Sequence, residues 1–358
     1  MDKVKVLMLG SSENVRGGIT TVVNGFRGES FSDSINVQYV STHFNVNKIY
    51  NIIGYLFAYL KVFFIMINSR PDVVHMHMSE RGSFIRKYYL FKLCKLFDIP
   101  VILHMHGAEF EEYYHSSNPK IQVRIREFLK EARLVVALGE RWSEIIKEIE
   151  PLSNVQIMYN AVTLPSHEIR IEQNKVVNIL FLAVVIERKG IKLLIEASEK
   201  VVNDMNKLNK EVIFNICGDG DLKELLEFEV REKKLDKYFN FTGWIDKEQK
   251  VNYLDNADIF VLPSYNEGLP LSILEAMSYG IPIIATNVGS IDEAVINGYN
   301  GYLIEPGDSV NLANKIVECI NSSDYESFSK ASRKLAEDKF NVIQYNSRFA
   351  DLYRTGSE

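Results

Sequence analysis

Apolar strand-like runs alternate with helical stretches along almost the whole chain, and this pattern limits the fold more than any other feature. The runs Leu134–Leu138 and Ile259–Leu262 are apolar throughout rather than at every second position, and Val4–Leu9 is apolar apart from Lys5. Such a strand is buried on both faces, as in a parallel sheet covered by helices. Because strand and helix alternate throughout, the sequence predicts an α/β chain with doubly wound parallel sheets.

The length of 358 residues predicts two such domains, at roughly 100–200 residues each. We place the boundary in Leu164–Lys175, which is polar, contains Pro165 and shows neither helical nor strand period. The expected domains are 1–165 and 166–340. A last helix within 341–358 could pack back on the first domain.

Composition excludes some classes of protein. The formal charge of −6 argues against a nucleic-acid binder held by bulk positive charge. The cysteines Cys94, Cys217 and Cys319 lack CxxC spacing, which indicates a reducing compartment and no disulfide framework. The apolar start of the chain is too short for a signal peptide and is typical of a first strand.

The segment Asn51–Ile67 is nearly all apolar, with Lys61 as its interruption. We expect a buried helix of the first domain. At about 17 residues it is at the lower limit for crossing a bilayer, so a membrane span and a surface contact remain as alternatives.

Ligands of open α/β sheets bind beyond the carboxyl ends of the strands, so residues after each strand are the candidates. Gly17 and Gly18 precede a helix, and Gly218-Asp219-Gly220 follows a strand. Glycines let a ligand approach the backbone, and a helix N-terminus binds anions. The spacing does not match the GxGxxG dinucleotide fingerprint, and a tight turn alone is the alternative interpretation.

Two further stretches after strands carry charge. Glu187-Arg188-Lys189-Gly190 places two cations before a helix, which suits a diphosphate, although solvated surface charge is the alternative. In Tyr265–Gly280, Pro270 fits the start of a helix running over Leu271–Tyr279. Gly268 to Ser272 then surround a second helix N-terminus, with Glu267 on the preceding loop and Glu275 on the helix.

With these motifs in place, nearly the whole chain resembles the retaining GT-B glycosyltransferases of family 4, the group 1 glycosyltransferases. The most specific match is Glu267 and Glu275 with seven residues between them. Supporting matches are RGGI at Arg16–Ile19, HMHG at His104–Gly107, YNAV at Tyr159–Val162, ERKG at Glu187–Gly190, ICGDG at Ile216–Gly220 and NGYNGYLI at Asn297–Ile304.

The resemblance implies two Rossmann-like domains facing a cleft, the first for the acceptor and the second for a nucleotide sugar. It implies that Glu275 holds the ribose, that Glu267 faces the donor sugar, and that His106 touches that sugar. Lys189 would neutralise the leaving diphosphate in place of a metal ion. The implied donor-binding residues are Gly17, Gly18, Gly218, Gly220, Ile245, Gly268, Leu269, Pro270, Leu271 and Glu275.

One departure from the family pattern concerns the phosphate clamp. The family has an Arg five residues before this lysine, where the present chain has Val184. Arg188 could supply a replacement donor. If no cation other than Lys189 reached the phosphates, catalysis would be weak.

Four histidines end two neighbouring predicted strands, and residues i and i+2 share a strand face. His75, His77, His104 and His106 could therefore hold a metal ion. No Asp, Glu or Cys completes a recognisable set, so we expect His75 and His104 in the packed interior, with His77 and Ser79 as cleft candidates.

The segment Arg81–Phe97 reads as a basic amphipathic helix that could lie on anionic lipid, with a solvated helix face as the alternative. The expected function is retaining, metal-independent transfer of a hexose-type sugar, with a UDP-sugar favoured, to a glycan or polyprenyl-linked glycan in bacterial surface polysaccharide synthesis. The expected place is the cytoplasm, with a peripheral position on the inner face of the membrane as an alternative.

Other functions stay open. A GT-B epimerase shares the fold but should lack the context of the two glutamates. A non-catalytic nucleotide-sugar binder remains an alternative because of Val184, and a metal-dependent hydrolase remains one because of the histidines. A Rossmann dehydrogenase is excluded because its fingerprint is absent.

Overall fold

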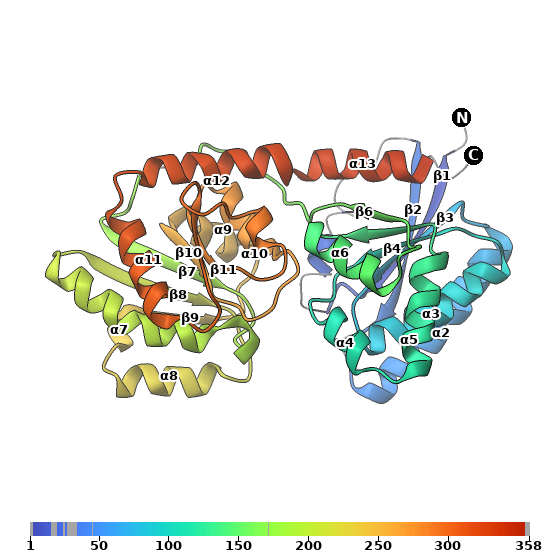
Figure 1. Cartoon of the computed structure of the whole chain (residues 1–358), viewed down its shortest axis with the longest axis horizontal. Helices are drawn as coiled ribbons and strands as arrows, with labels where there is room; N and C mark the ends of the chain where they lie inside the picture. Colours follow the sequence, from blue (N-terminus) through green and yellow to red (C-terminus); the bar gives the residue numbers. More distant parts are fainter. Residues whose placement is uncertain are drawn as a thin grey trace. The chain divides into compact units, whose positions relative to one another are not determined.

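A computed structural model describes residues 3–15, 20–23, 26, 34–44, 46–170 and 172–354. The chain divides into two compact units (Figure 1). The first unit comprises Met1–Ala161 and Val342–Glu358, and the second comprises Val162–Asn341. The last helix therefore belongs to the first unit.

The described part of the first unit is a parallel sheet of six strands in the order β2-β1-β3-β4-β5-β6, flanked by helices. Figure 1 shows α2, α3 and α5 on one side of this sheet and α13 on the other. The elements are β1 (Val4–Ser11), β2 (Ile35–His43), α2 (Lys48–Asn68), β3 (Val73–Met78), α3 (Gly82–Leu96), β4 (Val101–Met105), α4 (Phe110–Ser116), α5 (Pro119–Glu131), β5 (Leu134–Ala137), α6 (Glu140–Ile149), β6 (Val155–Ile157) and α13 (Val342–Arg354).

The second unit repeats the architecture with the order β12-β11-β10-β7-β8-β9, again parallel throughout its described strands. Helix α7 packs on α11, and α10 packs on α12. The elements are β7 (Val176–Leu182), η1 (Glu187–Lys189), α7 (Ile191–Lys207), β8 (Glu211–Cys217), α8 (Lys223–Glu232), η2 (Asp236–Tyr238), β9 (Phe239–Gly243), α9 (Lys247–Asn256), β10 (Ile259–Leu262), α10 (Leu271–Ser278), β11 (Ile283–Thr286), η3 (Ile291–Glu293), β12 (Gly301–Ile304), α11 (Ser309–Asn321) and α12 (Tyr325–Lys339).

The predicted doubly wound α/β architecture is confirmed. Strands β4, β5, β10 and β11 are buried along their whole length, as their continuous apolar sequences require. In the second unit the chain adds strands on one side of β7 and then returns to place β10 on its other side. The loops after β7 and β10 therefore flank the switch point of the sheet, where ligands of such folds bind.

Two helices were not predicted from the sequence. Helix α4 is only seven residues long. Helix α12 is longer, but four of its six buried positions are serine or alanine, including the fully buried Ser329, Ser332 and Ala336. Small side chains let this helix pack closely on its neighbours, and they leave no apolar stripe for a periodicity search to detect.

Helix α2 contradicts the expectation of a buried core helix. Only Ala58, Val62, Ile65 and Met66 are buried. Most of its large apolar side chains are exposed, with Ile49 at 70% and Phe57 at 69%. By length and composition alone, the helix could cross a membrane.

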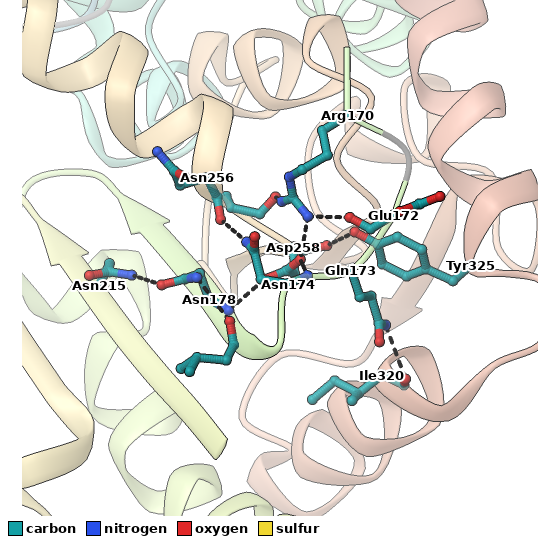
Figure 2. A network of polar contacts seen from close by, with 12 residues as sticks. Arg170, Glu172, Gln173, Asn174, Asn178, Asn215, Asn256, Asp258, Ile320 and Tyr325 are labelled. Carbon is teal, nitrogen blue, oxygen red and sulfur yellow. Dashed lines mark hydrogen bonds and ion pairs between the residues drawn. The ribbon is translucent and has the colours of Figure 1, made fainter. Parts of the chain in front are cut away.

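A buried carboxylate, Asp258, joins the start of the second unit to its sheet (Figure 2). Its two oxygens accept hydrogen bonds from Arg170 Nη1 (3.0 Å), from the backbone N–H of Asn174 (2.8 Å) and from the backbone N–H of Asn178 (2.7 Å). The amide of Asn174 also donates to Asp258, at 3.1 Å. These hydrogen bonds stabilise the negative charge of the buried Asp258 carboxylate.

These contacts change the expected position of the hinge between the domains. We expected Leu164–Lys175 to be a free linker, but Arg170 and Asn174 are bound to Asp258, and Gln173 donates to the carbonyl of Ile320. The second half of that stretch is therefore part of the second unit. The chain passes between the units at residues 161–162 and 341–342.

We predict that Asp258→Ala lowers the free energy of unfolding of the second unit by roughly 3 kcal/mol, because it removes the acceptor of two backbone N–H groups and one hydrogen bond of the partly exposed Arg170 guanidinium. Urea unfolding followed by circular dichroism measures the change. Asp255→Ala is the matched control, because Asp255 is partly exposed and pairs with His167 on the surface. Equal loss in both variants would contradict the prediction.

Candidate active site

Glu267 lies in the loop that follows β10, and only 5% of its surface is exposed. Lys189 Nζ lies 2.5 Å from its Oε1, and the hydroxyl of Ser264 donates to the same oxygen at 2.7 Å. Arg188 Nη1 lies 3.9 Å from the other carboxylate oxygen. Two cations from the loop after β7 thus face one carboxylate from the loop after β10.

The backbones of these two loops are joined as well. The backbone N–H of Tyr265 donates to the carbonyl of Arg188 at 2.8 Å, and Arg188 Nη1 donates to the carbonyl of Asn266 at 2.7 Å. Gly190 has a φ of +68°, and a Cβ there would lie 1.8 Å from the carbonyl oxygen of Pro263. A glycine is required at this position because the loops touch at their backbones.

The loop after β11 supports Glu267 from a third strand. The backbone N–H of Ser290 donates to the carbonyl of Gly268 at 2.9 Å, and the hydroxyl of Thr286 donates to the carbonyl of Ser264. Sequence reasoning missed Ser264, Thr286 and Ser290. Their positions at or shortly after the ends of the buried strands β10 and β11 were the available signal.

The start of α10 keeps the character expected of an anion site. Pro270 is the residue before the helix, with an extended backbone, rather than its first residue. No side chain caps this end of the helix. Gly268 and Leu269 are buried, whereas Leu271 and Ser272 are half-buried. The first backbone N–H groups of a helix have no partner within it, so they can bind an anion.

Glu275, one turn into α10, has its own lysine. Lys250 Nζ from α9 lies 2.5 Å from Glu275 Oε1, and both side chains are partly exposed. Sequence reasoning missed Lys250, which is separated from Glu275 by 25 positions. Ile245, half-buried, stands between β9 and α9, beside the exposed Trp244. Different lysines therefore neutralise the two glutamates.

The glycines after β8 have a structural role that the sequence did not reveal. A Cβ on Gly218 would lie 1.8 Å from the carbonyl oxygen of Ala183, and one on Gly220 would lie 2.4 Å from that of Val185. These glycines let the loop after β8 approach the loop after β7, so ligand approach is not needed to explain them. Gly17 and Gly18 lie outside the described residues.

Four histidines of the first unit gather on one face of its sheet, on β3, on β4 and directly after β4. His75, His77 and His104 are buried, which confirms the interior positions of His75 and His104 and makes the cleft expectation for His77 wrong. His106 and Ser79 remain half-exposed. The nitrogen–nitrogen contacts are 3.2 Å for His75–His104 and 2.9 Å for His77–His106.

Helix α13 closes this histidine group. The hydroxyl of Tyr353 lies 2.6 Å from His75 Nδ1, and the ring of Phe349 stacks on His75 and His104. Among the described residues, His75, His77 and His104 also form a group whose spacing could hold a metal ion. Hydrogen bonds engage four of their six ring nitrogens, leaving Nε2 of His77 and of His104.

Burial keeps these rings neutral. It lowers the pKa of His75, with a smaller effect from His106, to about 3. It also lowers the pKa of His106, with a smaller effect from Lys87, to about 3. The pKa values of His77 and His104 fall well below the usual value, first because of burial and then because of neighbouring histidines. A neutral ring both donates and accepts, as these paired contacts require.

Several of the cations expected to form a lipid-binding surface over Arg81–Phe97 are paired or buried. Lys92 pairs with Glu127 at 2.5 Å, and Lys95 pairs with Glu131, both on α5. Lys87 is fully buried and donates to Thr42. The neighbouring helix therefore neutralises much of the charge that the sequence placed on this surface.

Comparison with known families matches residues 166–335 to the model of the glycosyl transferases group 1. An uncharacterised 41.2 kDa protein of the cps region of Klebsiella pneumoniae is 27% identical, over 96% of this chain and 98% of the relative. The Escherichia coli UDP-Gal:alpha-D-GlcNAc-diphosphoundecaprenol alpha-1,3-galactosyltransferase is also 27% identical, over 82% of this chain and 78% of the relative.

Among solved structures, Anabaena Alr3699/HepE in complex with UDP is similar, with a TM-score of 0.75 and 19% identity. The match covers 98% of this chain and all of the other. At this identity the likeness shows the fold, which is GT-B.

We predict that acid destabilises the first unit through its histidines. Their folded pKa values lie below the unfolded value of about 6.5, so the unfolded chain binds more protons as the pH falls. Between about pH 6.5 and 3, each such histidine lowers the free energy of unfolding by up to about 1.4 kcal/mol per pH unit. Thermal unfolding across this range should show a smaller acid shift in His75→Phe than in the wild type. His115→Gln, on the exposed His115, should leave the shift unchanged, and an unchanged shift in His75→Phe would contradict the prediction.

Proposed function

The chain belongs to the group 1 glycosyltransferases, and from this premise we propose that it moves a hexose-type sugar from a nucleotide sugar to a glycan or lipid-linked glycan with retention of configuration. The observation that carries the proposal is the group of Lys189, Arg188 and Glu267 beside the uncapped start of α10. This group offers cations and backbone N–H groups next to a buried carboxylate. A sugar diphosphate needs this combination of charges.

In the proposed reaction the leaving group is the nucleoside diphosphate. Negative charge grows on its β-phosphate as the bond to the anomeric carbon breaks. Lys189, Arg188 and the first N–H groups of α10 stabilise that charge in a partly dehydrated site. They also make a metal ion unnecessary, so we propose a metal-independent transfer.

Glu267 faces the positive charge that develops on the sugar ring. The acceptor hydroxyl attacks the anomeric carbon from the face that the diphosphate leaves, and its proton passes to an oxygen of the departing phosphate. The new bond joins the acceptor oxygen to the sugar, and no side chain needs to act as a base. The ion pair with Lys189 and the hydrogen bond from Ser264 hold the Glu267 carboxylate in a fixed orientation.

Glu275 is proposed to bind the ribose hydroxyls of the donor. Because Lys250 already lies 2.5 Å from its Oε1, the hydroxyls would share this carboxylate with the lysine or use its second oxygen. The E. coli relative is named for UDP-galactose and a diphosphoundecaprenol-linked acceptor. We propose the same classes here, a UDP-sugar and a polyprenyl-linked glycan, handled on the cytoplasmic side of a membrane.

Glu267→Gln tests the role of this carboxylate. It keeps the size of the side chain but removes the negative charge, so we expect sugar transfer to fall at least about a hundredfold. Binding of UDP, followed by thermal shift, should persist. The transfer assay contains EDTA, a UDP-sugar donor and polyprenyl-linked glycan acceptors extracted from membranes. Full transfer by the variant with the same product anomer would overturn the assignment, and loss of wild-type transfer in EDTA would overturn metal independence.

Arg188→Met tests whether this residue replaces the arginine absent at Val184. Loss of one cation beside the diphosphate should lower kcat by about tenfold to a hundredfold. Lys192→Met is the matched control, because Lys192 lies on the next turn but pairs with the exposed Glu187. The replacement idea fails if both variants keep wild-type kcat.

A further inference from the structure

The feature that the proposed function leaves unexplained is the exposed face of α2. Its outward apolar side chains recur at the spacing of one helical face from end to end. The members of this apolar face are Ile49, Tyr50, Ile52, Ile53, Leu56, Phe57, Leu60, Phe64 and Ile67, each at least 43% exposed. A helix of this length carries the stripe over about 30 Å. Contiguous apolar surface of this extent marks an interaction site.

The inner side of α2 is firmly attached to the first unit. The amide of Asn51 exchanges hydrogen bonds with the backbone of Phe44, and the hydroxyl of Tyr55 donates to the carbonyl of Arg86. Gly54 packs directly on the ring of Phe44, where a Cβ would lie 2.8 Å away. The helix therefore lies along the surface of its unit, and its outer side has no cover among the described residues.

Charge on and around α2 is mainly positive. The helix contains no acidic residue, and its two charged residues are the exposed Lys48 and Lys61. At its end, Arg70 is exposed and Lys5 Nζ reaches the carbonyl of Ser69 at 3.4 Å. A surface that combines a long apolar face with lysines at its borders is complementary to anionic phospholipid, whose acyl chains lie beneath phosphate groups.

A second copy of the chain fits this face less well. Pairing two α2 helices through their apolar faces would bring Lys61 of each copy to the edge of the shared surface, and α2 has no carboxylate to neutralise it there. At a bilayer surface the same lysine can extend its aliphatic part along the apolar layer and place its ammonium among phosphates.

We propose that α2 is an in-plane membrane anchor, whose apolar face inserts into the interface of an anionic phospholipid bilayer. This inference rests on the proposed function in one respect: a lipid-linked acceptor would give the enzyme a reason to bind a membrane. Helices of this kind lie parallel to the membrane with their apolar side about 5–10 Å deep. The anchor differs from the basic surface expected over 81–97, because burial of apolar groups supplies the binding.

Vesicle co-sedimentation of the full chain tests the anchor. Vesicles of phosphatidylethanolamine and phosphatidylglycerol should bind the wild type, and phosphatidylcholine vesicles should bind it more weakly. Leu56→Ser/Phe64→Ser should lower the partition constant by more than about tenfold, because two apolar side chains no longer enter the bilayer. Leu225→Ser/Phe228→Ser is the matched control, since these residues of α8 are equally exposed, at 54% and 57%, and lie in the second unit.

Three results would overturn the proposal: no binding of the wild type to the anionic vesicles, an equal loss in the control variant, or a wild-type dimer that Leu56→Ser/Phe64→Ser dissociates. Donor hydrolysis measured in solution reports on the catalytic site separately. Retained hydrolysis without vesicle binding would refute the anchor alone, and vesicle binding without any sugar transfer would refute the proposed function alone.

Probe depth distinguishes a helix in the plane from one that spans the bilayer. Cys94, Cys217 and Cys319 are buried, so a new surface cysteine can be labelled selectively. Ile53→Cys and Phe64→Cys, labelled with an environment-sensitive dye, are about 16 Å apart along the helix. Equal quenching of both dyes by brominated lipids is expected for the in-plane anchor, and clearly unequal depths would overturn it.

Discussion

The second unit is organised around one buried carboxylate, Glu267, which has lost most of its contact with water. Removing such a charge from water costs several kcal/mol unless partners compensate. Lys189 and Ser264 supply those partners, and they come from different loops. The loops can meet only because Gly190 leaves room for a backbone carbonyl. The pairing of charges at this site therefore depends on the close packing of the two loops. A donor diphosphate would bind beside Lys189 and Glu267, which are already paired with each other.

Helix α2 presents the opposite arrangement, with apolar side chains in water and few partners. A continuous apolar segment is compatible with a core helix, a membrane span and a membrane-surface helix alike. Its sequence alone favoured the core. The decisive observations are three-dimensional: which side bonds to Phe44 and Arg86, and which side has no cover.

Prediction succeeded where the signal is local. The bounds of β10 agree with the predicted run Ile259–Leu262, and α10 lies within one residue of the predicted helix Leu271–Tyr279, because both are bounded by local signals. It failed for α12, whose buried face is built from small residues, and for the pairing of Lys250 with Glu275. No pattern of neighbours along the chain indicates which lysine meets which glutamate when they come from different helices.

The sequence by itself determined the alternation of strands and helices, the positions of candidate residues after the strands and the resemblance to a glycosyltransferase family. These depend on periodicity and on short motifs, which are properties of neighbouring residues. Only the tertiary structure decided that Lys189 and Arg188 face Glu267, that His77 is buried and that α2 is exposed. Those outcomes depend on strand order and on helix orientation, which bring together residues that are distant along the chain.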